Sequence, residues 1–221
     1  MSRVWYTSDT HLDHTFVAKL RGFTYEKKGP DGETVIVGDK AAHDRAIIAN
    51  WNSVVRPDDT VWLLGDVGMG HFERWETSIR QLNGTIHLIA GNHDDVSPVH
   101  RDSWKYQGQW MYQGRFASVQ AYARRKVGSY MFLLSHFPYD GDHTGTDRYT
   151  QYRLRDEGMW LVHGHTHLPE RISGAMRMEP GTMSSPAKWM GRQLHVGLDA
   201  WGLHPVSQED VIAEMAKAEL T

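Results

Sequence analysis

Short β-rich runs that each end in a cluster of glycine, aspartate, asparagine or histidine recur along this chain. Strands are expected at residues 4–7, 60–64 and 85–90, because each run is short, apolar and bounded by turn-forming residues. Helical patterns at 41–54 and 72–82 separate these strands. The alternation indicates an α/β fold in which three strands deliver polar side chains at their carboxyl ends.

The second half of the chain has a more antiparallel pattern. Residues 116–123 and 129–134 flank the turn-like stretch 124–128, which predicts a hairpin. Two further strands are expected at 159–162 and 194–198.

Capping residues mark the expected helix boundaries. Asp39 precedes the helix at 41–54 as a candidate N-cap. Ser207, with Asp210 three positions on, resembles a capping box that opens a C-terminal helix, with aspartate in the place of glutamate. The pair Asn83-Gly84 closes the helix expected at 72–82.

Length and composition limit the class of protein. A chain of 221 residues with 40% hydrophobic and 23% charged residues is expected to fold as one compact domain over 1–221, and no linker is visible. The chain contains 14 histidines and no cysteine. Disulfides, thiolate metal sites and a cysteine nucleophile are therefore excluded, and any metal would be bound by imidazole, carboxylate, amide or water.

Several partners and locations are disfavoured by the same data. No apolar run reaches the roughly 18 residues that a membrane span needs, so no membrane association is expected. The N-terminus reaches Ser8-Asp9 too soon for a signal peptide, and a cytoplasmic location is expected. A formal charge of −3 predicts no extended nucleic-acid surface. The oligomeric state is left open.

Five expected strand ends carry groups that can bind a metal. In an extended chain, side chains at i and i+2 point to the same side, so the members of an Asp-x-His or His-x-His pair can reach one cation. One such pair is weak evidence for a metal site. Five strand ends that all carry such groups are stronger evidence, because α/β folds place their functional sites at the carboxyl ends of strands. The residues are Asp9 and His11, Asp66, Asn92 and His93, His136, and His165 and His167.

These motifs, taken in order, resemble the five motifs of the calcineurin-like metallophosphoesterases. They are Asp9-Thr10-His11, Gly65-Asp66, Gly91-Asn92-His93-Asp94, Ser135-His136 and Gly164-His165-Thr166-His167. Their spacing is similar to that of the small single-domain bacterial and phage-encoded members. The resemblance implies a four-layer αββα sandwich, in which two mixed β-sheets are flanked by helices and a dimetal site lies at the strand ends.

The resemblance also implies roles for these residues. Asp9, His11 and His167 would hold one metal, Asn92, His136 and His165 a second, Asp66 would bridge both, and His93 would be catalytic without binding metal. Two divalent ions about 3.5–4 Å apart clamp a phosphate and activate a water. By resemblance manganese is favoured, and iron or zinc also suits the donor atoms. A cationic His93 can protonate the departing alkoxide, which is worth about 10²–10⁴ in rate.

The sequence departs from the related phosphoprotein phosphatases beside two motifs. Those enzymes place arginines next to the second and third motifs and an aspartate that orients the catalytic histidine. Here the stretches 65–70 and 89–94 contain no arginine, and the equivalent aspartate is absent. A phosphoprotein substrate is therefore not expected, and Asp94 or Asp95 is the candidate to orient His93.

Substrate contacts are expected from three further residues. The polar stretch 139–158 is too long for an ordinary loop and is predicted to rim the site, with Arg148 as a phosphate contact. His14 and Asp94 are the other candidates, although a histidine at a helix start also packs locally. Asp199, with Trp201, is interpreted as part of a structural turn.

The predicted activity is that of a dinuclear metal-dependent phosphodiesterase acting on small nucleotide esters such as 2′,3′-cyclic nucleotides. Two enzymatic alternatives are a phosphomonoesterase and a dinucleoside polyphosphate hydrolase. A third alternative is a catalytically silent metal-binding interaction module. The presence of Asp66, Asn92 and His93 argues against it, because a scaffold has no need of a catalytic histidine.

Overall fold

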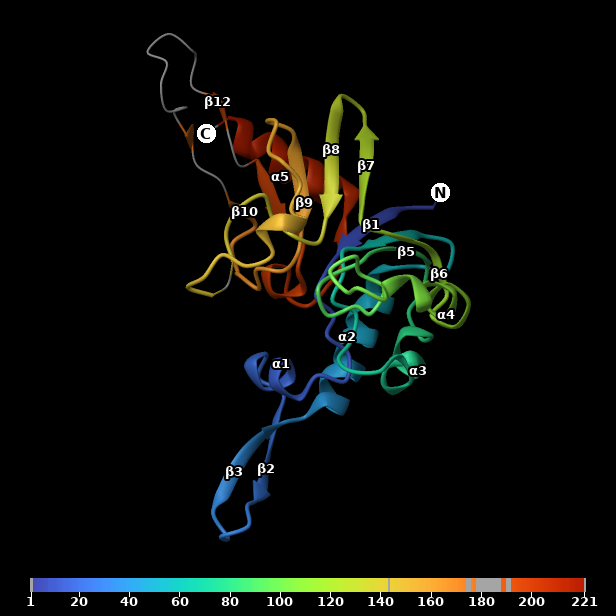
Figure 1. Cartoon of the computed structure of the whole chain (residues 1–221), viewed down its shortest axis with the longest axis vertical. Helices are drawn as coiled ribbons and strands as arrows, with labels where there is room; N and C mark the ends of the chain where they lie inside the picture. Colours follow the sequence, from blue (N-terminus) through green and yellow to red (C-terminus); the bar gives the residue numbers. More distant parts are fainter. Residues whose placement is uncertain (1, 143, 174–175, 178–187, 190–191, 221) are drawn as a thin grey trace.

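The computed structural model describes residues 2–142, 144–173, 176–177, 188–189 and 192–220. Two five-stranded sheets form its body, with the strand orders β14-β1-β4-β5-β6 and β10-β13-β9-β8-β7 (Figure 1). The strands of the first sheet are β1 (Val4–Thr7), β4 (Thr60–Leu63), β5 (Thr85–Ile89), β6 (Phe116–Gln120) and β14 (Val206–Ser207). Those of the second are β7 (Tyr122–Val127), β8 (Tyr130–Ser135), β9 (Trp160–His163), β10 (Ile172–Ser173) and β13 (Gln193–His195).

Both sheets are mixed. Strands β1, β4, β5 and β6 run parallel, whereas β14 pairs antiparallel with β1. In the second sheet β8, β9 and β13 run parallel, and the outer strands β7 and β10 are antiparallel. The carboxyl ends of neighbouring parallel strands lie at the same edge of each sheet. The Asp, Asn and His motifs come directly after these strand ends and therefore lie at that edge.

Helices cover one face of the first sheet. Ile47 and Trp51 of α2 (Lys40–Val54) and Trp110 of α4 (Gln107–Gln113) are buried in one core cluster with Leu63 and Leu88 of the sheet. The short helices η1 (Phe72–Arg74) and α3 (Glu76–Ile79) contribute Trp75 and Ile79 to the same cluster. This face is the main hydrophobic core of the molecule.

A second cluster joins the two sheets. Tyr6 and Leu64 from the first sheet and Phe132 and Val162 from the second are all fully buried in it. The C-terminal helix α5 (Gln208–Glu219) adds Val211 and Met215 to this cluster. The arrangement is consistent with the expected αββα sandwich.

The expected helix caps are present. The backbone N–H of Ala42 donates to Asp39 Oδ1 over 2.9 Å at the start of α2. At the start of α5, the N–H of Asp210 donates to Ser207 Oγ over 3.1 Å. Both signals depend only on neighbouring residues, which explains why the sequence pattern located them.

The hairpin that was predicted around 124–128 exists, but its predicted boundaries were wrong. Residues 116–120 form β6, which pairs in parallel with β5 of the first sheet. The chain then crosses to the second sheet, where β7 pairs with β8, and the turn lies at Gly128, with φ +58°. The basic residues at 124–126 looked like a turn because they alternate between exposed and half-buried positions along an edge strand.

The single helix expected at 72–82 is instead two short helices, η1 and α3. Trp75 lies at the junction, with φ −119°. Its indole packs edge-on against Phe72 and Trp110 at ring-centroid distances of 4.7 and 4.8 Å. The burial of the Trp75 indole therefore accounts for the break between the two helices, although the apolar pattern of residues 72–82 is that of one continuous helix.

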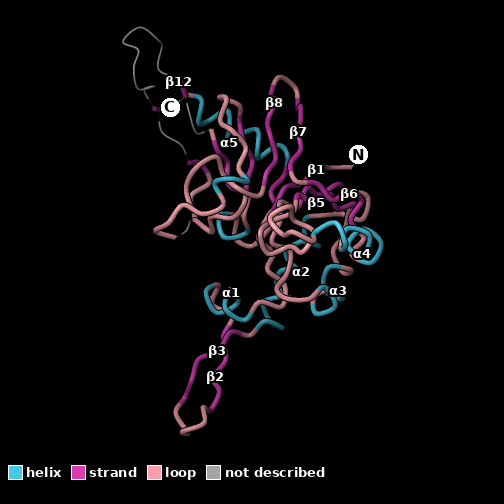
Figure 2. The backbone as a smooth tube through the Cα atoms, viewed as in Figure 1, coloured by secondary structure: helices cyan, strands magenta, loops and turns pink. Residues whose placement is uncertain are grey.

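The segment between β1 and α2 contains elements that the sequence analysis did not predict. It forms α1 (Thr15–Leu20) and a hairpin of β2 (Thr24–Lys28) and β3 (Thr34–Gly38). The hairpin extends away from the body of the molecule (Figure 2). The remaining short elements are η2 (Ser103–Lys105), η3 (Thr150–Tyr152), η4 (Leu198–Ala200), and the pair β11 (Met176–Arg177) and β12 (Lys188–Trp189).

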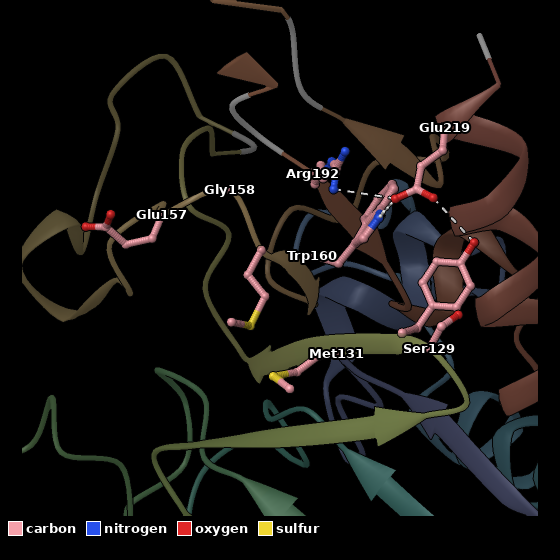
Figure 3. A pocket seen from close by; sticks show the side chains of 9 residues that line it. Ser129, Met131, Glu157, Gly158, Trp160, Arg192 and Glu219 are labelled. Carbon is pink, nitrogen blue, oxygen red and sulfur yellow. Dashed lines mark hydrogen bonds and ion pairs between the residues drawn. The ribbon is translucent and has the colours of Figure 1, made fainter.

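The end of α5 is anchored to the second sheet by Glu219 (Figure 3). One carboxylate oxygen accepts from Trp160 Nε1 over 3.0 Å, and the other accepts from the Tyr130 hydroxyl over 3.4 Å. Arg192 pairs with the same carboxylate at 3.5 Å. Among the described residues, no helix has the length and apolar composition that a membrane crossing requires.

Candidate functional site

The loops that follow five strands meet at one edge of the molecule. Strands β1, β4 and β5 are parallel neighbours in the first sheet, and β8 and β9 are parallel neighbours in the second. The backbone N–H groups of Asp9 and His11 donate to the carbonyls of Gly65 and Asp66, each over 3.0 Å. This connection fixes the loop after β1 against the loop after β4.

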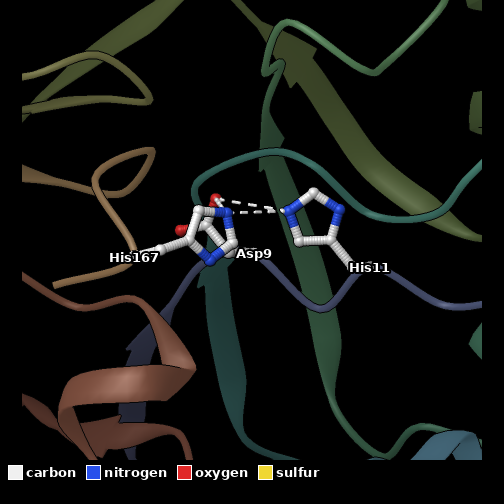
Figure 4. A group of neighbouring side chains, drawn as sticks. All are labelled: Asp9, His11 and His167. Atoms are coloured by element: carbon white, nitrogen blue, oxygen red, sulfur yellow. Dashed lines mark hydrogen bonds and ion pairs between the residues drawn. The ribbon is translucent and has the colours of Figure 1, made fainter. Parts of the chain in front are cut away.

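Asp9, His11 and His167 form a first Asp/His group (Figure 4). His11 Nε2 and His167 Nε2 lie 3.1 Å apart. Asp9 Oδ1 lies 3.9 Å from His11 Nε2 and 3.8 Å from His167 Nε2. One nitrogen or oxygen from each side chain therefore points to a common centre.

Asp66, His136 and His165 form a second Asp/His group in which all three residues are buried. Asn92 extends it, because its Oδ1 lies 3.0 Å from His136 Nε2. All four residues come from the loops after β4, β5, β8 and β9. The structure thus brings together the residues of each set that the resemblance assigned to one metal.

Asp66 lies between the two groups. Its Oδ2 is 3.7 Å from His11 Nε2 of the first group, and its Oδ1 is 3.6 Å from His136 Nε2 of the second. Each carboxylate oxygen therefore faces a different group, which is the placement that a bridging ligand needs.

The donor atoms fit divalent cations. Asp9 is 0% exposed and Asp66 2% exposed, yet in the described part of the chain neither forms an ion pair with a lysine or arginine. Buried carboxylates are costly unless a counter-charge or a metal compensates them. The imidazole and carboxylate donors suit manganese, iron or zinc.

Two histidines have their outer nitrogen fixed by a neighbouring acceptor. His136 Nδ1 lies 2.7 Å from the Leu64 carbonyl, and His167 Nδ1 lies 2.9 Å from Asp199 Oδ2. When Nδ1 donates to these acceptors, Nε2 is left with a free lone pair directed at the site. This is the tautomer that a metal ligand needs.

Burial also keeps two histidines neutral. It lowers the pKa of His11 well below its ordinary value, and the neighbouring His167 lowers it further. Burial, with His136 nearby, lowers the pKa of His165 to about 3. Both rings are therefore uncharged near neutral pH, as metal binding requires.

His136 and His167 behave differently. Burial acts to lower the pKa of His136, but the carboxylates of Asp66 and Asp9 raise it above the ordinary value. Burial likewise acts against a charged His167, but its hydrogen bond to Asp199 and the nearby Asp9 raise its pKa. The surrounding carboxylates thus favour a cation at both rings, either a proton or a metal ion.

The site backbone is strained. Asp9, His11, Asp66, His165 and His167 have φ values of 60°, 45°, 53°, 70° and 52°. This left-handed region costs non-glycine residues of order 1–3 kcal/mol each, and such strain concentrates at functional sites. A glycine is needed beside them at position 65, where φ is +88° and a Cβ would lie 2.7 Å from His136 Nδ1.

His93 lies at the mouth of the site and belongs to neither Asp/His group. Its side chain is 41% exposed, and Nε2 lies 4.0 Å from Asp66 Oδ2. Its backbone N–H donates to Asp66 Oδ1 over 2.9 Å. The ring is therefore held beside the proposed bridging carboxylate while it remains accessible to a ligand.

Asp94 does not occupy the position expected of a substrate contact. It is 0% exposed, and its carboxylate accepts the backbone N–H groups of Asp66, Val67 and Gly91 over 3.0, 2.9 and 2.7 Å. Burial, together with the Asp66 carboxylate, raises the pKa of Asp94 to about 7. Asp94 joins the loops after β4 and β5, and so positions Asp66 rather than a substrate.

His14 caps a helix and also lies in the lining of the cavity. Its Nδ1 accepts the backbone N–H of Val17 over 3.3 Å, which caps α1. Its ring also lines the cavity above the site and lies edge-on to His11 at 5.3 Å between centroids.

Arg148 is paired with a carboxylate in its own segment. Its Nε and Nη2 donate to Asp142 over 3.1 and 3.0 Å. Asp142 Oδ2 in turn lies 3.4 Å from His165 Nε2. The stretch 139–158 therefore reaches the second Asp/His group through Asp142, a residue that the sequence analysis did not single out. Arg148 itself is absent from the described lining of the main cavity.

Asp199 lies in the short 3-10 helix η4, in line with the turn expected there, but its carboxylate also has partners that the sequence analysis did not predict. Besides binding His167, its carboxylate accepts from Nε and Nη2 of Arg21, each over 2.8 Å. Arg21 Nη2 also donates to the backbone carbonyl of Asp9 over 2.8 Å. Asp199 and Arg21 therefore form an outer layer that orients the first Asp/His group. No local pattern signals a contact between residues so far apart in sequence.

A cavity of about 340 Å³ opens above both groups. Its polar side is formed by His11, Asp66, Asn92, His93, His165 and His167. Its other side is formed by α1, through Phe16, Val17 and Leu20.

Asp199→Asn is expected to weaken metal binding at the first Asp/His group about 10–100-fold, the usual effect of losing an outer-layer partner of a histidine ligand. The amide cannot both hold Arg21 by a charge-assisted pair and accept from His167. The second group, which Asp199 does not touch, should keep its affinity. Metal titration calorimetry measures the two affinities.

Asp102→Asn is the matched control, because the ion pairs of Asp102 within the described ranges are with its surface neighbours Arg101 and Lys105. It should leave both affinities unchanged. Equal losses at both groups in Asp199→Asn would contradict the specific role of this carboxylate and indicate a general disturbance of the fold.

Comparison with known protein families agrees with this geometry. The model of the calcineurin-like phosphoesterase superfamily domain matches residues 3–196. The chain belongs to this superfamily, whose members hydrolyse phosphoric esters, as the motifs implied.

Phage proteins are among its relatives. The Gene 66 protein of Mycobacterium phage L5 is 39% identical over 96% of this chain and 93% of its own length. The Gene 66 protein of phage D29 is 38% identical over 97% and 96%. A solved structure of a protein of unknown function from Aquifex aeolicus has a TM-score of 0.61 and 21% identity, covering 96% of this chain and 99% of that one. At that identity the likeness concerns the fold alone.

Proposed function

We propose that this protein is a dinuclear metal-dependent phosphodiesterase that hydrolyses small nucleotide esters, such as 2′,3′-cyclic nucleotides. Membership of the superfamily supports phosphoester hydrolysis. The observation that carries the dinuclear assignment is the position of Asp66, with one oxygen 3.7 Å from His11 and the other 3.6 Å from His136.

In this proposal Asp9, His11 and His167 hold one ion, Asn92, His136 and His165 hold the other, and Asp66 binds both. Manganese is the favoured metal, with iron or zinc as alternatives. When bound, two such ions offset phosphate charge and lower the pKa of the attacking water.

His93 is proposed to act as the general acid. Its partly exposed ring borders both Asp66 and the cavity, so its Nε2–H can reach an ester oxygen that departs on the cavity side. Protonation of that oxygen avoids the release of a free alkoxide. The contact between the His93 N–H and Asp66 fixes the backbone from which the ring extends.

The preference for diesters is supported by the charges around the cavity. Arg21 is the single lysine or arginine in its described lining, and its guanidinium is engaged by Asp199 and by the carbonyl of Asp9. A phosphomonoester carries up to two negative charges, and a diester carries one. A site with few available cationic side chains therefore favours the diester.

A panel of substrates assayed with Mn²⁺ tests this proposal. The panel comprises 2′,3′-cyclic AMP, bis-p-nitrophenyl phosphate, p-nitrophenyl phosphate and a dinucleoside polyphosphate. We expect the two diesters to have the highest kcat/KM and a chelator to abolish all turnover. Asp66→Asn, prepared in the same way, controls for contaminating hydrolases, because the loss of both metals should abolish its turnover on every substrate of the panel.

The other outcomes are distinguishable. Faster hydrolysis of p-nitrophenyl phosphate or of the dinucleoside polyphosphate would overturn the diester assignment in favour of that activity. A preparation with two bound metals and no turnover on the whole panel would instead identify a catalytically silent metal-binding module.

A further inference from the structure

Helix α1 contributes an apolar wall to the cavity, whose other lining residues are histidines, carboxylates, Asn92 and Arg21. Phe16 and Leu20 lie one helical turn apart and both line the cavity. Their exposed fractions are 63% and 68%, so both side chains present apolar area to the solvent at the cavity.

The core does not require these two side chains. Val17 and Ala18 are the residues of α1 that face inward, with exposed fractions of 7% and 0%. Phe16 and Leu20 could be polar without loss of packing, and exposure of apolar area to water has a cost. Their position on the cavity side is therefore better explained by a ligand than by folding.

The wall is held at a fixed position relative to the first Asp/His group. His14 caps the start of α1, and Arg21, directly after Leu20, caps its end. The Arg21 guanidinium donates to the carbonyl of Asp9 and to Asp199, which contacts His167. The same side chain thus fixes both the end of the wall and the backbone of a proposed metal ligand.

We propose that Phe16 and Leu20 form a binding subsite for the base of the nucleotide ester. This inference rests on the proposed function, because it takes the phosphoryl group to lie at Asp66. From there the rest of a ligand must extend along the cavity, and α1 offers it a neutral, apolar surface. A planar heterocycle stacks well on such a surface, and a charged group does not.

The size of the cavity favours a mononucleotide. Its volume of about 340 Å³ lies at the lower end of the range for small-ligand sites. Stacking of one base on one aromatic side chain is sequence-tolerant, because every base presents a flat face. The subsite is therefore expected to accept purines and pyrimidines alike.

Kinetics with and without a base provide the first test. Phe16→Ala is expected to lower kcat/KM for 2′,3′-cyclic AMP about tenfold, mainly through KM. Hydrolysis of ribose 2′,3′-cyclic phosphate, which lacks a base, should change less than about twofold. Phe16→Tyr retains the face of the aromatic ring, so its kcat/KM for 2′,3′-cyclic AMP should equal that of the wild type.

The absence of cysteine from the chain permits a second test that does not depend on turnover. Leu20→Cys introduces a single thiol at the wall and leaves the Phe16 ring in place, and its rate of labelling by a maleimide can be followed. With Mn²⁺ present, adenosine 2′-monophosphate is expected to slow this labelling, whereas ribose 5-phosphate is not. Tyr112→Cys, at an 88% exposed position on α4, is the control and should label equally fast under all conditions.

The possible results separate this inference from the proposed function. One result would overturn the base subsite and leave the proposed diesterase activity intact. In it, the wild-type protein cleaves ribose 2′,3′-cyclic phosphate as well as 2′,3′-cyclic AMP, and the nucleotide does not protect the introduced thiol. If the wild-type protein cleaves neither ester but the nucleotide protects the thiol, the subsite stands and the catalytic proposal fails. Equal losses on both esters in Phe16→Ala would make the wall structural and overturn the subsite.

Discussion

Asp66→Asn is expected to lose metal at both positions at once. The neutral amide has a single oxygen for metal binding, whereas the carboxylate directs one charged oxygen to each Asp/His group. The loss at each position should exceed the roughly 10–100-fold that removal of an outer-layer partner causes. Metal content after dialysis, measured by elemental analysis, is the direct readout.

His11→Ala and His136→Ala are the matched comparisons for this result. Each removes a donor from one group, so each should mainly weaken one position. Two tightly held ions in Asp66→Asn would contradict the bridging role of this residue.

The metal-free form of Asp66→Asn should fold normally, which separates loss of metal from loss of structure. The amide oxygen can still accept the backbone N–H of His93, which Asp66 Oδ1 accepts over 2.9 Å. The substitution also removes one of two neighbouring buried carboxylates, since Asp66 is a cause of the raised pKa of Asp94. The thermal midpoint of the metal-free variant should therefore equal or exceed that of the metal-free wild type.

His93→Ala is expected to keep both metals and to lose turnover by about 10²–10⁴ for esters with poor leaving groups. The ring belongs to neither Asp/His group, and the backbone contact with Asp66 remains in the variant. An activated leaving group such as p-nitrophenolate departs without a proton. The turnover of p-nitrophenyl esters should therefore fall much less in His93→Ala. A series of aryl and alkyl diesters, assayed for kcat against leaving-group pKa, measures this dependence.

His204→Ala is the control for this series, because His204 bonds locally to the Gly202 carbonyl and does not line the cavity. Its kinetics should match those of the wild type for every leaving group. An equal loss for all leaving groups in His93→Ala would show instead that His93 stabilises charge or positions the phosphate, and does not supply a proton.

The motif residues could be located from sequence because their placement follows a local rule. A short apolar strand that ends in Asp, Asn or His delivers that side chain to the carboxyl edge of its sheet, whatever the rest of the chain does. Asp9, Asp66 and His136 follow β1, β4 and β8 in this way. The caps Asp39 and Ser207 are equally local, because each bonds to a residue three positions on.

The sheet to which each strand belongs required the tertiary structure. The sequence pattern predicted one strand at 116–123 followed by a turn at 124–128, yet β6 pairs with β5 of the first sheet and β7 pairs with β8 of the second. Long-range pairing of this kind depends on which strands have room beside them, and the amino-acid pattern of one segment does not contain that information.

The sequence alone therefore predicted the family and the sandwich, which are confirmed, and the side chains proposed to bind metal, since each of these follows from short motifs and their order. The structure alone decided what surrounds them: Asp199 against His167, Arg21 against Asp9, Asp142 against His165, and the wall of α1. These contacts join residues from different strand ends and loops through single hydrogen bonds or exposed side chains. Such pairs leave no periodic trace in the sequence, because the packing of the two sheets, and not any local preference, brings them within reach.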